Sequence, residues 1–219
     1  MYKGGLKLFD MTERDEKYYR IIEGAHKLFT NNGIRNVSMD DVARSLGMSK
    51  KTIYQYVENK TDLLKHILDF IMENVETKIS EIENRDLNAI DVLLDMSKIV
   101  GEKIMKFNPV VSFELEKYFP SVFETYKTRK KQMMKEFIRK NIEKGIREGY
   151  YRSDLNSEVV AHLYFEKIED LYKPDILEQE NFTFEDLFKV MFENHIRGIS
   201  NEKGIKYFEK QKDMLTFKV

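Results

Sequence analysis

The stretch GIRNVSMDDVARSLGMSKKTIYQYVENKTD, residues 33–62, has the pattern of two very short helices and the start of a third. Ser38 is a helix-capping residue, and the aspartate three positions later completes a capping box. Gly47 can end the first helix because glycine takes the left-handed conformation without a steric penalty. Ser49 can cap a second helix, from Lys50 to about Tyr56. Two such helices, joined by a turn that contains glycine, predict a helix-turn-helix motif.

The outer face of the second short helix is the candidate binding surface. A helix of about two turns is not stable alone, so packing must hold it and its outer side chains are free to bind. Ile53 and Val57 are four residues apart and can face inward. The outward groups are then amines, a hydroxyl, an amide and a phenol, which are types that contact base edges and phosphates: Lys50, Lys51, Thr52, Gln55 and Tyr56. A solvated helical face has the same composition.

The order of the residues carries more information than their composition. The runs A25-x-x-L-F29, G33, S38-x-x-D-V-A43, G47-M-S-K-K-T-I-Y-Q-Y56 and N59-K-T-D-L-L64 stand at fixed spacing. Over about residues 16–68, this pattern closely resembles the DNA-binding domain of the TetR family of repressors. Beyond residue 70 the resemblance is one of helical architecture only.

The resemblance implies a role for each position that matches the family pattern. Lys50 and Thr52 are expected to reach bases or nearby phosphates, and Ser38 lies at the DNA-facing start of the first short helix. Tyr54 and Tyr56 are expected to hold the DNA backbone, and so is Lys60. The complete set of expected DNA-binding residues is Ser38, Ser49, Lys50, Lys51, Thr52, Tyr54, Gln55, Tyr56 and Lys60.

Three charged residues in this region affect how it could contact DNA. Lys60 stands at a helix N-terminus, where free amides and the helix dipole also suit a phosphate, although a plain surface lysine is the alternative. Lys51 stands where many family members have a small residue, and it adds a possible phosphate contact. Asp40 is acidic where some relatives are basic, which argues against base reading from the first short helix.

Composition predicts an all-α protein of about nine helices. The chain has 219 residues, 42% of them hydrophobic, with only 3 prolines and long segments of helical period. We expect a flexible arm over residues 1–11, a helix-turn-helix DNA-binding domain over 12–62, and a ligand-binding and dimerisation domain over 63–219. The expected helices of the whole chain, besides the two short ones, cover residues 12–31, 60–82, 87–107, 109–119, 120–148, 157–173 and 184–199, with a further short helix within 201–219.

Charge and residue usage limit the class of protein. Residues 1–60 hold 11 basic and 8 acidic side chains, whereas residues 61–219 hold 26 and 30, a mild asymmetry that fits a basic binding domain on an acidic body. The chain has no cysteine, which excludes disulfides and thiolate chemistry. No apolar run approaches the ~20 residues of a membrane helix, and the N-terminus lacks a signal peptide's apolar stretch. We therefore expect a cytoplasmic protein without a membrane partner.

Two C-terminal helices are apolar over more of their circumference than one core requires. We interpret them as a two-fold interface that forms a four-helix bundle in a homodimer, the location that the family resemblance also implies. Dimerisation would place two reading helices ~34 Å apart and predicts a near-palindromic DNA operator as the partner. The expected interface residues are Val160, Tyr164, Phe165, Phe188, Met191, Phe192 and His195.

The family resemblance also implies a pocket for a small-molecule effector in the second domain. A wall rich in Met and Phe would favour an apolar or aromatic molecule, although ordinary core has the same composition. The expected pocket residues are Met96, Val100, Ile104, Phe107, Phe113, Met133, Phe137 and Tyr164. Repression with release by ligand is the family default.

The alternatives to a ligand-controlled regulator are an enzyme, an adaptor that binds a protein partner, and a DNA binder without ligand control. The sequence contains no HExxH, GxSxG, P-loop or dinucleotide-binding pattern, so we expect neither an enzyme nor a cofactor. His162 and Glu166 are one helical turn apart, but two ligands are too few for a metal site, and a surface pair is the simpler interpretation. Binding to DNA from the region upstream of the gene would separate a regulator from an adaptor.

Overall fold

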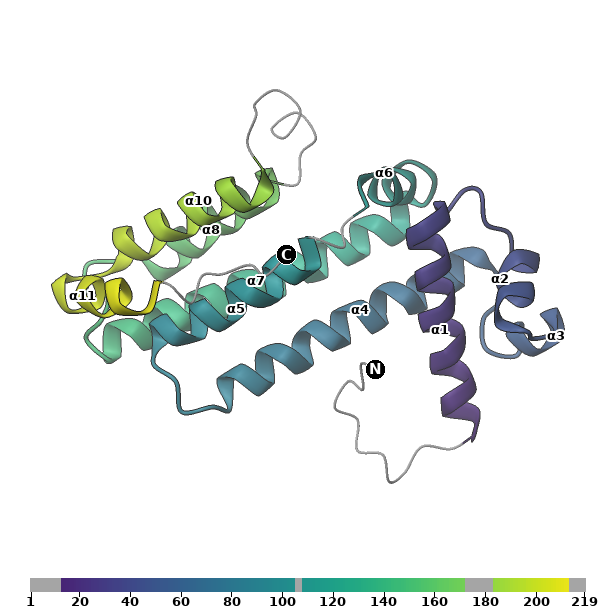
Figure 1. Ribbon diagram of the computed structural model, residues 1–219, viewed down its shortest axis with the longest axis horizontal. Coiled ribbons are helices and arrows are strands. Elements are labelled where there is room, and N and C mark those ends of the chain that lie inside the picture. Colours follow the sequence, from purple (N-terminus) through teal and green to yellow (C-terminus); the bar gives the residue numbers. More distant parts are fainter. Residues whose placement is uncertain (1–12, 105–107, 172–182, 213–219) are drawn as a thin grey trace. The chain divides into compact units, whose positions relative to one another are not determined.

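The computed structural model describes residues 13–104, 108–171 and 183–212, and these residues form ten α-helices and no β-strand (Figure 1). The all-α prediction is confirmed. The expected arm over residues 1–11, the candidate pocket residue Phe107 and the last part of the tail lie outside the described residues.

The chain divides into two compact units, of which the first is Met1–Thr77 with Asn108–Lys130 and the second is Lys78–Phe107 with Lys131–Val219. This division by contacts differs from the expected functional boundary at residue 62, because the start of α4, α6 and the start of α7 pack with the helix-turn-helix. Helices α4 and α7 contribute residues to both units.

The first unit is built around the helix-turn-helix. Figure 1 shows α2 (Met39–Leu46) beside α1 (Glu13–Asn32), and α3 (Lys50–Ile53) next to α2. The apolar faces of its helices enclose one core, in which Phe29, Val42, Ile53, Leu63 and Leu115 are buried. The helices of this unit are α1 (Glu13–Asn32), α2 (Met39–Leu46), α3 (Lys50–Ile53), the first part of α4 (Lys60–Glu83), α6 (Pro109–Tyr118) and the first part of α7 (Pro120–Arg147).

Local sequence signals set the ends of α2. Ser38 and Asp41 form the expected capping box, since each side chain accepts a hydrogen bond from the other residue's backbone N–H. Gly47 ends the helix in the left-handed conformation, with φ at 62°. Both predictions for this helix are confirmed.

Helix α3 is shorter than predicted, since it ends at Ile53 instead of about Tyr56. After Ile53 the chain continues as tight turns, in which the N–H of Gln55 donates to the carbonyl of Thr52 at 3.2 Å and that of Tyr56 donates to Ile53 at 2.9 Å. These turns carry Val57 into the core, where 2% of it is exposed. The burial of Val57 in the core is therefore favoured over the continuation of α3 by a further turn.

The second unit contains the end of α4, α5 (Ala89–Ile104), most of α7, α8 (Ser157–Asp170), α10 (Phe184–Ile199) and α11 (Glu202–Gln211). Helices α8 and α10 lie side by side (Figure 1). Both helices are capped, α8 by Asn156 and α10 by a capping box of Thr183 and Asp186. The tail after α10 forms the short helix α11, whose Phe208 is fully buried.

The buried side chain of Tyr151 takes part in hydrogen bonds that connect the two sequence segments of the second unit. The Tyr151 hydroxyl donates to Oδ1 of Asn141 at 3.2 Å, and Nδ2 of Asn141 donates to the carbonyl of Ala89 at 2.8 Å. Gly145 leaves the space that the Tyr151 ring occupies. Among the described residues, no helix is long and apolar enough to cross a membrane.

Candidate nucleic-acid interface

The segment from Lys50 to Val57 presents the predicted binding face outward. Ile53 and Val57 are buried as expected, with 1% and 2% exposed. Lys50, Lys51, Tyr54 and Gln55 are exposed, whereas Thr52 and Tyr56 are partly buried. The buried pair therefore fixes which side of this short segment faces solvent.

The side chain of Lys50 already has a partner on α2. Its Nζ lies 2.7 Å from Oδ1 of Asp40, and both side chains are about half exposed. The hydrogen bond from Asp40 raises the pKa of the Lys50 ammonium. This contact occupies one of the three N–H donors of Lys50 and places a carboxylate beside the predicted reading residue. The sequence shows the acid, but its pairing across the turn of the motif is a feature that we did not predict.

Two of the predicted contact residues serve as helix caps. Oγ of Ser49 accepts from the N–H of Thr52 at 3.0 Å, and the two hydroxyl oxygens lie 2.8 Å apart. The Ser38 hydroxyl donates to Oδ2 of Asp41 at 2.6 Å. The hydrogen bonds between Ser49 and Thr52 order the first turn of α3. The hydroxyl oxygens of these two residues keep further lone pairs that can accept a hydrogen bond from a ligand.

The ring of Tyr56 lies among aromatic side chains from α1 and α4. Its centroid is 6.4 Å from that of Tyr18, whose hydroxyl is 2.9 Å from Nδ1 of His66. Tyr54 is more exposed, at 46%. The two expected backbone-holding tyrosines thus differ, because Tyr56 is fixed by neighbours and Tyr54 projects into solvent.

The structure places the Lys60 ammonium inside the first unit. Nζ donates to the carbonyls of Ile34 and Val37, both at 2.5 Å, and lies 5.7 Å from the centre of the Phe29 ring. Burial lowers the pKa of this ammonium. Two of the three N–H donors of Lys60 are bound to these carbonyls, so this geometry favours a role inside the protein over the expected phosphate contact.

The exposed apolar surface of α8 and α10 agrees only in part with the expected interface residues. Phe165, Phe188 and Phe192 are buried in the core of the second unit, with at most 3% exposed, so they are corrected from interface to core. They lie inside because the large aromatic rings bury more area than any neighbour on their helices. The large apolar side chains that face solvent are Val159, Leu163 and Val190, with 51%, 56% and 60% exposed.

An apolar groove of about 970 Å³ runs between these two helices. It contains four of the expected interface residues, Val160, Tyr164, Met191 and His195, together with Leu163 and Val190. The His195 ring stacks on Tyr164 with the centroids 3.5 Å apart and the planes at 5°. Among the described residues, the buried Nε2 of His195 has no hydrogen-bond partner, and burial lowers the pKa of this imidazole to about 3.

The expected pocket residues do not all come together. Met96, Phe137 and Tyr164 are buried and Val100 and Met133 partly buried, all in the second unit. Phe113 belongs to the first unit and is 57% exposed, so it is corrected from pocket wall to surface. The sequence could not separate these cases, because α6 has apolar residues on more than one face. The side chain of Ile104 lies outside the described residues, as does Phe107.

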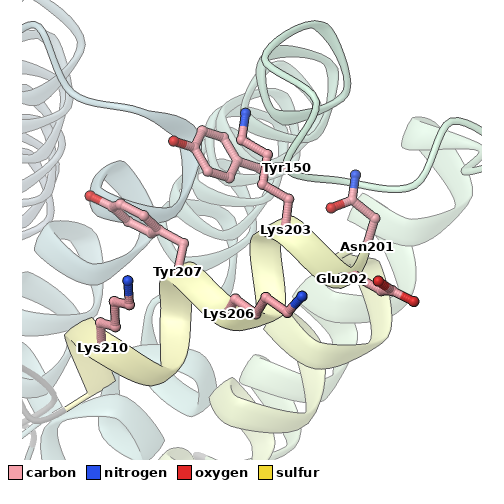
Figure 2. A pocket seen from close by; sticks show the side chains of 7 residues that line it. All are labelled: Tyr150, Asn201, Glu202, Lys203, Lys206, Tyr207 and Lys210. Carbon is pink, nitrogen blue, oxygen red and sulfur yellow. The ribbon is translucent and has the colours of Figure 1, made fainter.

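A second hollow, of about 680 Å³, lies over α11 and combines two tyrosines with three lysines (Figure 2). Its polar groups bind within the protein: the Tyr207 hydroxyl donates to Asp91 at 2.7 Å, and Nζ of Lys203 donates to the carbonyl of Glu148 at 3.1 Å. Nζ of Lys203 also lies 4.1 Å from the centre of the Tyr150 ring. These contacts explain the arrangement without a ligand.

The described residues contain no group of three metal-ligating side chains. The His162 and Glu166 pair is a surface contact, since Oε1 of Glu166 is 3.8 Å from Nδ1 of His162 and accepts from Nζ of Lys131 at 2.6 Å. A metal site is therefore not needed to explain this pair.

Comparison with known proteins relates the chain to bacterial regulators. The family described as "Bacterial regulatory proteins, tetR family" matches residues 21–67. An HTH-type transcriptional regulator of Staphylococcus aureus strain USA300 is 33% identical over 121 residues, which cover 51% of this chain and 65% of that protein. Another from S. aureus strain RF122 is matched over 45% of its length, so the alignments span less than two thirds of these relatives.

Solved structures show the same fold at low sequence identity. A TetR-family transcriptional regulator from Cytophaga hutchinsonii has a TM-score of 0.68 at 17% identity, covering 89% of this chain and 100% of that chain. AibR, in complex with isovaleryl coenzyme A and operator DNA, has a TM-score of 0.55 at 20% identity, covering 82% and 96%. The two S. aureus relatives and the C. hutchinsonii protein are each described as a transcriptional regulator. The helix-turn-helix described above thus lies in the region that matches the tetR family of bacterial regulatory proteins, and the chain shares the fold of TetR-family structures.

Proposed function

We propose that this chain is a transcriptional regulator that binds double-stranded DNA through the exposed face of Lys50–Tyr56. The observation that carries the proposal is the orientation of this segment: Ile53 and Val57 are buried, which leaves Lys50, Lys51 and Gln55 exposed on a rigid frame. Ammonium and amide groups on a short helix suit phosphates and base edges in a major groove. A protein-binding adaptor would not need this combination of residues.

We propose further that the active form is a homodimer joined along α8 and α10. One helix of this length reads few base pairs, and two copies double the contacts. The exposed side chains of Val159, Leu163 and Val190 and the groove beside them support this location, since a second copy would remove them from water. Two copies of the Lys50–Tyr56 segment, held one DNA turn apart, predict an operator with two half-sites in near-palindromic order.

Repression released by a small, largely apolar ligand is the form of regulation that we propose. The buried Met96 and Phe137 of the second unit, with the partly buried Met133, support an apolar site, because methionine adapts to varied ligand shapes. AibR, which shares the fold, was solved with both isovaleryl coenzyme A and operator DNA. Helix α4 is continuous from Lys60 to Glu83 and has residues in both units, so it can couple them.

The test is selection of duplexes from a random DNA pool by the full chain, followed by affinity measurements on the enriched sequence. We expect a near-palindrome with half-site centres about 10 base pairs apart. Lys50→Ala should weaken binding about ten- to hundredfold and relax the preferred sequence, if Lys50 reads a base. Lys27→Ala, which removes an exposed lysine of α1, is the matched control and should bind as the unmodified chain does. Absence of any enriched sequence would refute the proposal.

Ligand control is tested separately with the selected operator. A ligand that prefers the non-binding state by about 100-fold would weaken operator binding by up to ~2.7 kcal/mol. Apolar and acyl-coenzyme A compounds are the first to titrate. If saturating concentrations of compounds that demonstrably bind the chain leave operator affinity unchanged, the protein is a DNA binder without ligand control.

A further inference from the structure

The turn between α1 and α2, residues 33–37, is held by two side chains of opposite charge. Oε2 of Glu114 accepts hydrogen bonds from the N–H groups of Ile34 at 2.6 Å and Arg35 at 3.0 Å. Nζ of Lys60 donates to the carbonyls of Ile34 and Val37, both at 2.5 Å. Glu114 lies on α6 and Lys60 at the start of α4, so side chains from two separate helices form hydrogen bonds with the backbone of one short turn.

The Glu114 carboxylate is buried and the Lys60 ammonium is partly shielded from water, so both depend on the turn for hydrogen bonds. Glu114 is only 9% exposed and Lys60 is partly buried. A buried charge is tolerated only when hydrogen bonds replace its hydration, and here the peptide groups of the turn supply them. Removal of Glu114 would take the acceptor from two turn N–H groups, and removal of Lys60 would take the donor from the Val37 carbonyl, at the cost of their desolvation.

Gly33 allows the carboxylate to approach. Its φ is 81°, a conformation that side chains other than glycine rarely adopt, and a Cβ at this position would lie 3.1 Å from Oε2 of Glu114. The glycine thus provides both the turn conformation and the space for the buried acid. The sequence resemblance gave Gly33 no such partner.

Helix α6 makes further contacts on both sides of this turn. Nδ2 of Asn108 donates to the carbonyl of Thr30 at 2.8 Å. Nη1 of Arg35 donates to the Tyr118 hydroxyl at 3.2 Å, and the guanidinium lies 5.3 Å from the centre of that ring. The whole length of α6, from its N-cap to its last residue, is therefore bound to the end of α1 and the turn that follows.

The turn decides the direction in which the helix-turn-helix leaves α1. Val37 is buried with 4% exposed, and the next residue is Ser38, the N-cap of α2. A shift of the turn would move the cap, then α2, and with it the exposed segment after Ser49. A displacement of about 1 Å is enough to disrupt hydrogen bonds to base edges, whose donor–acceptor distances span only about 2.7–3.2 Å.

We propose that Glu114 and Lys60 are positioning residues for DNA recognition, acting through the backbone of residues 33–37 and not by touching DNA. This inference rests on the proposed function for its effect on DNA, but the contact itself can be tested without DNA. It replaces the expected phosphate contact of Lys60 with a role inside the protein. It also makes α6, which lies more than seventy residues further along the chain, part of the reading apparatus.

The first experiment measures hydrogen exchange over residues 33–37 in the full chain by mass spectrometry, for Glu114→Ala and Glu114→Gln. Glu116→Ala is the matched control, since Glu116 is an exposed carboxylate on the same helix. We expect Glu114→Ala to exchange about ten- to hundredfold faster at the turn, as loss of hydrogen bonds to a charged group implies. Glu114→Gln keeps an oxygen acceptor and should fall between, and Glu116→Ala should match the unmodified chain. Unchanged exchange in Glu114→Ala would overturn the contact. If Glu114→Ala does not fold, the Gln variant decides the question.

The second experiment compares affinities for the selected operator and for unrelated DNA. If the Lys50–Tyr56 segment is displaced, it loses contacts with bases but keeps its charges. Glu114→Ala should therefore lower the affinity for the operator by a factor at least ten times larger than the loss of affinity for unrelated DNA. Lys60→Met should likewise lose specificity while the salt dependence of binding stays the same. A phosphate contact by Lys60 predicts instead a uniform loss and a salt slope lower by about one. Faster exchange with an unchanged operator preference would refute the positioning role. If the unmodified chain binds no DNA, the proposed function fails while the exchange result still tests the contact.

Discussion

Leu163→Glu is the substitution that most directly tests the proposed dimer. Leu163 lies on α8 beside the groove between α8 and α10 and is 56% exposed, and Val190 on α10 is 60% exposed. In a two-fold arrangement each copy contributes both side chains to one interface. The substitution therefore places two carboxylates in the apolar contact.

The size of the effect follows from the exposed fractions. Full burial of a leucine or valine side chain contributes about 1.5–3 kcal/mol, so covering the exposed half of each contributes about 1 kcal/mol. Leu163→Glu removes about 2 kcal/mol from the two copies and adds the cost of burying two carboxylates, at least a few kcal/mol. A total above about 4 kcal/mol raises the dissociation constant of the dimer more than about a thousandfold.

Sedimentation velocity at micromolar concentration measures the outcome. We expect a dimer for the unmodified chain and a monomer for Leu163→Glu, with the helical circular dichroism retained because position 163 faces solvent in one chain. Val110→Glu is the matched control, since Val110 is 56% exposed but lies on α6 in the first unit. That variant should remain a dimer. A dimeric Leu163→Glu chain, or a monomeric unmodified chain, would refute the assignment of this face.

Three further predictions concern charge, protonation and packing. Asp40→Asn breaks the 2.7 Å contact with Lys50 and removes an acid beside the predicted DNA-binding face. Non-specific DNA affinity should therefore rise, and the dependence of this affinity on salt concentration should steepen by about one, as measured by fluorescence anisotropy. An unchanged salt dependence would contradict this prediction. Burial holds the pKa of His195 at about 3, below the ~6.5 of the unfolded chain, so stability is complete above pH 6.5 and is lost as the pH falls towards 3. Between pH 7 and pH 5 this loss amounts to about 2 kcal/mol, and urea unfolding of His195→Gln should lack it; the same pH dependence in both chains would disprove the assignment. In Gly145→Ala the new methyl group would overlap the buried Tyr151 ring, and a loss of about 1–3 kcal/mol in urea unfolding is expected; a gain in stability would show that the ring can move.

Local patterns predicted the capped ends of α2 because a cap depends on residues close in sequence. Ser38 forms the expected capping box with the acid three positions later, and Thr183 forms the same motif before α10. Gly47 and Gly149 both take the left-handed conformation where their helices end. Such contacts close small loops, so the residues that make them can be recognised from spacing alone.

Contacts between distant segments were not accessible in the same way. The sequence identifies Lys60 as a cation at a helix start, which is an equally good description of a phosphate ligand and of a side chain turned inward. The structure settles its partners because α1 and α4 bring the carbonyls of Ile34 and Val37 within reach. Glu114 was one of many acids in an amphipathic helix, and nothing in its local pattern indicated a partner eighty residues away.

The C-terminal helices show where hydrophobic periodicity stops being informative. On α10, Phe188, Phe192 and Ile196 form one stripe that is buried in the second unit, while Leu187 and Met191, each one position earlier, line the groove. Successive residues are about 100° apart on a helix, so the two stripes are adjacent and the pattern reads as one wide apolar face. Its width indicates apolar surface beyond the core, but not which stripe is buried and which lines the groove. Aromatic residues gain more from complete burial than aliphatic ones do, and this favours the phenylalanine stripe for the core. The aliphatic side chains therefore remain at the surface, which is why the proposed dimer is best tested at Leu163 and not at any of the three phenylalanines.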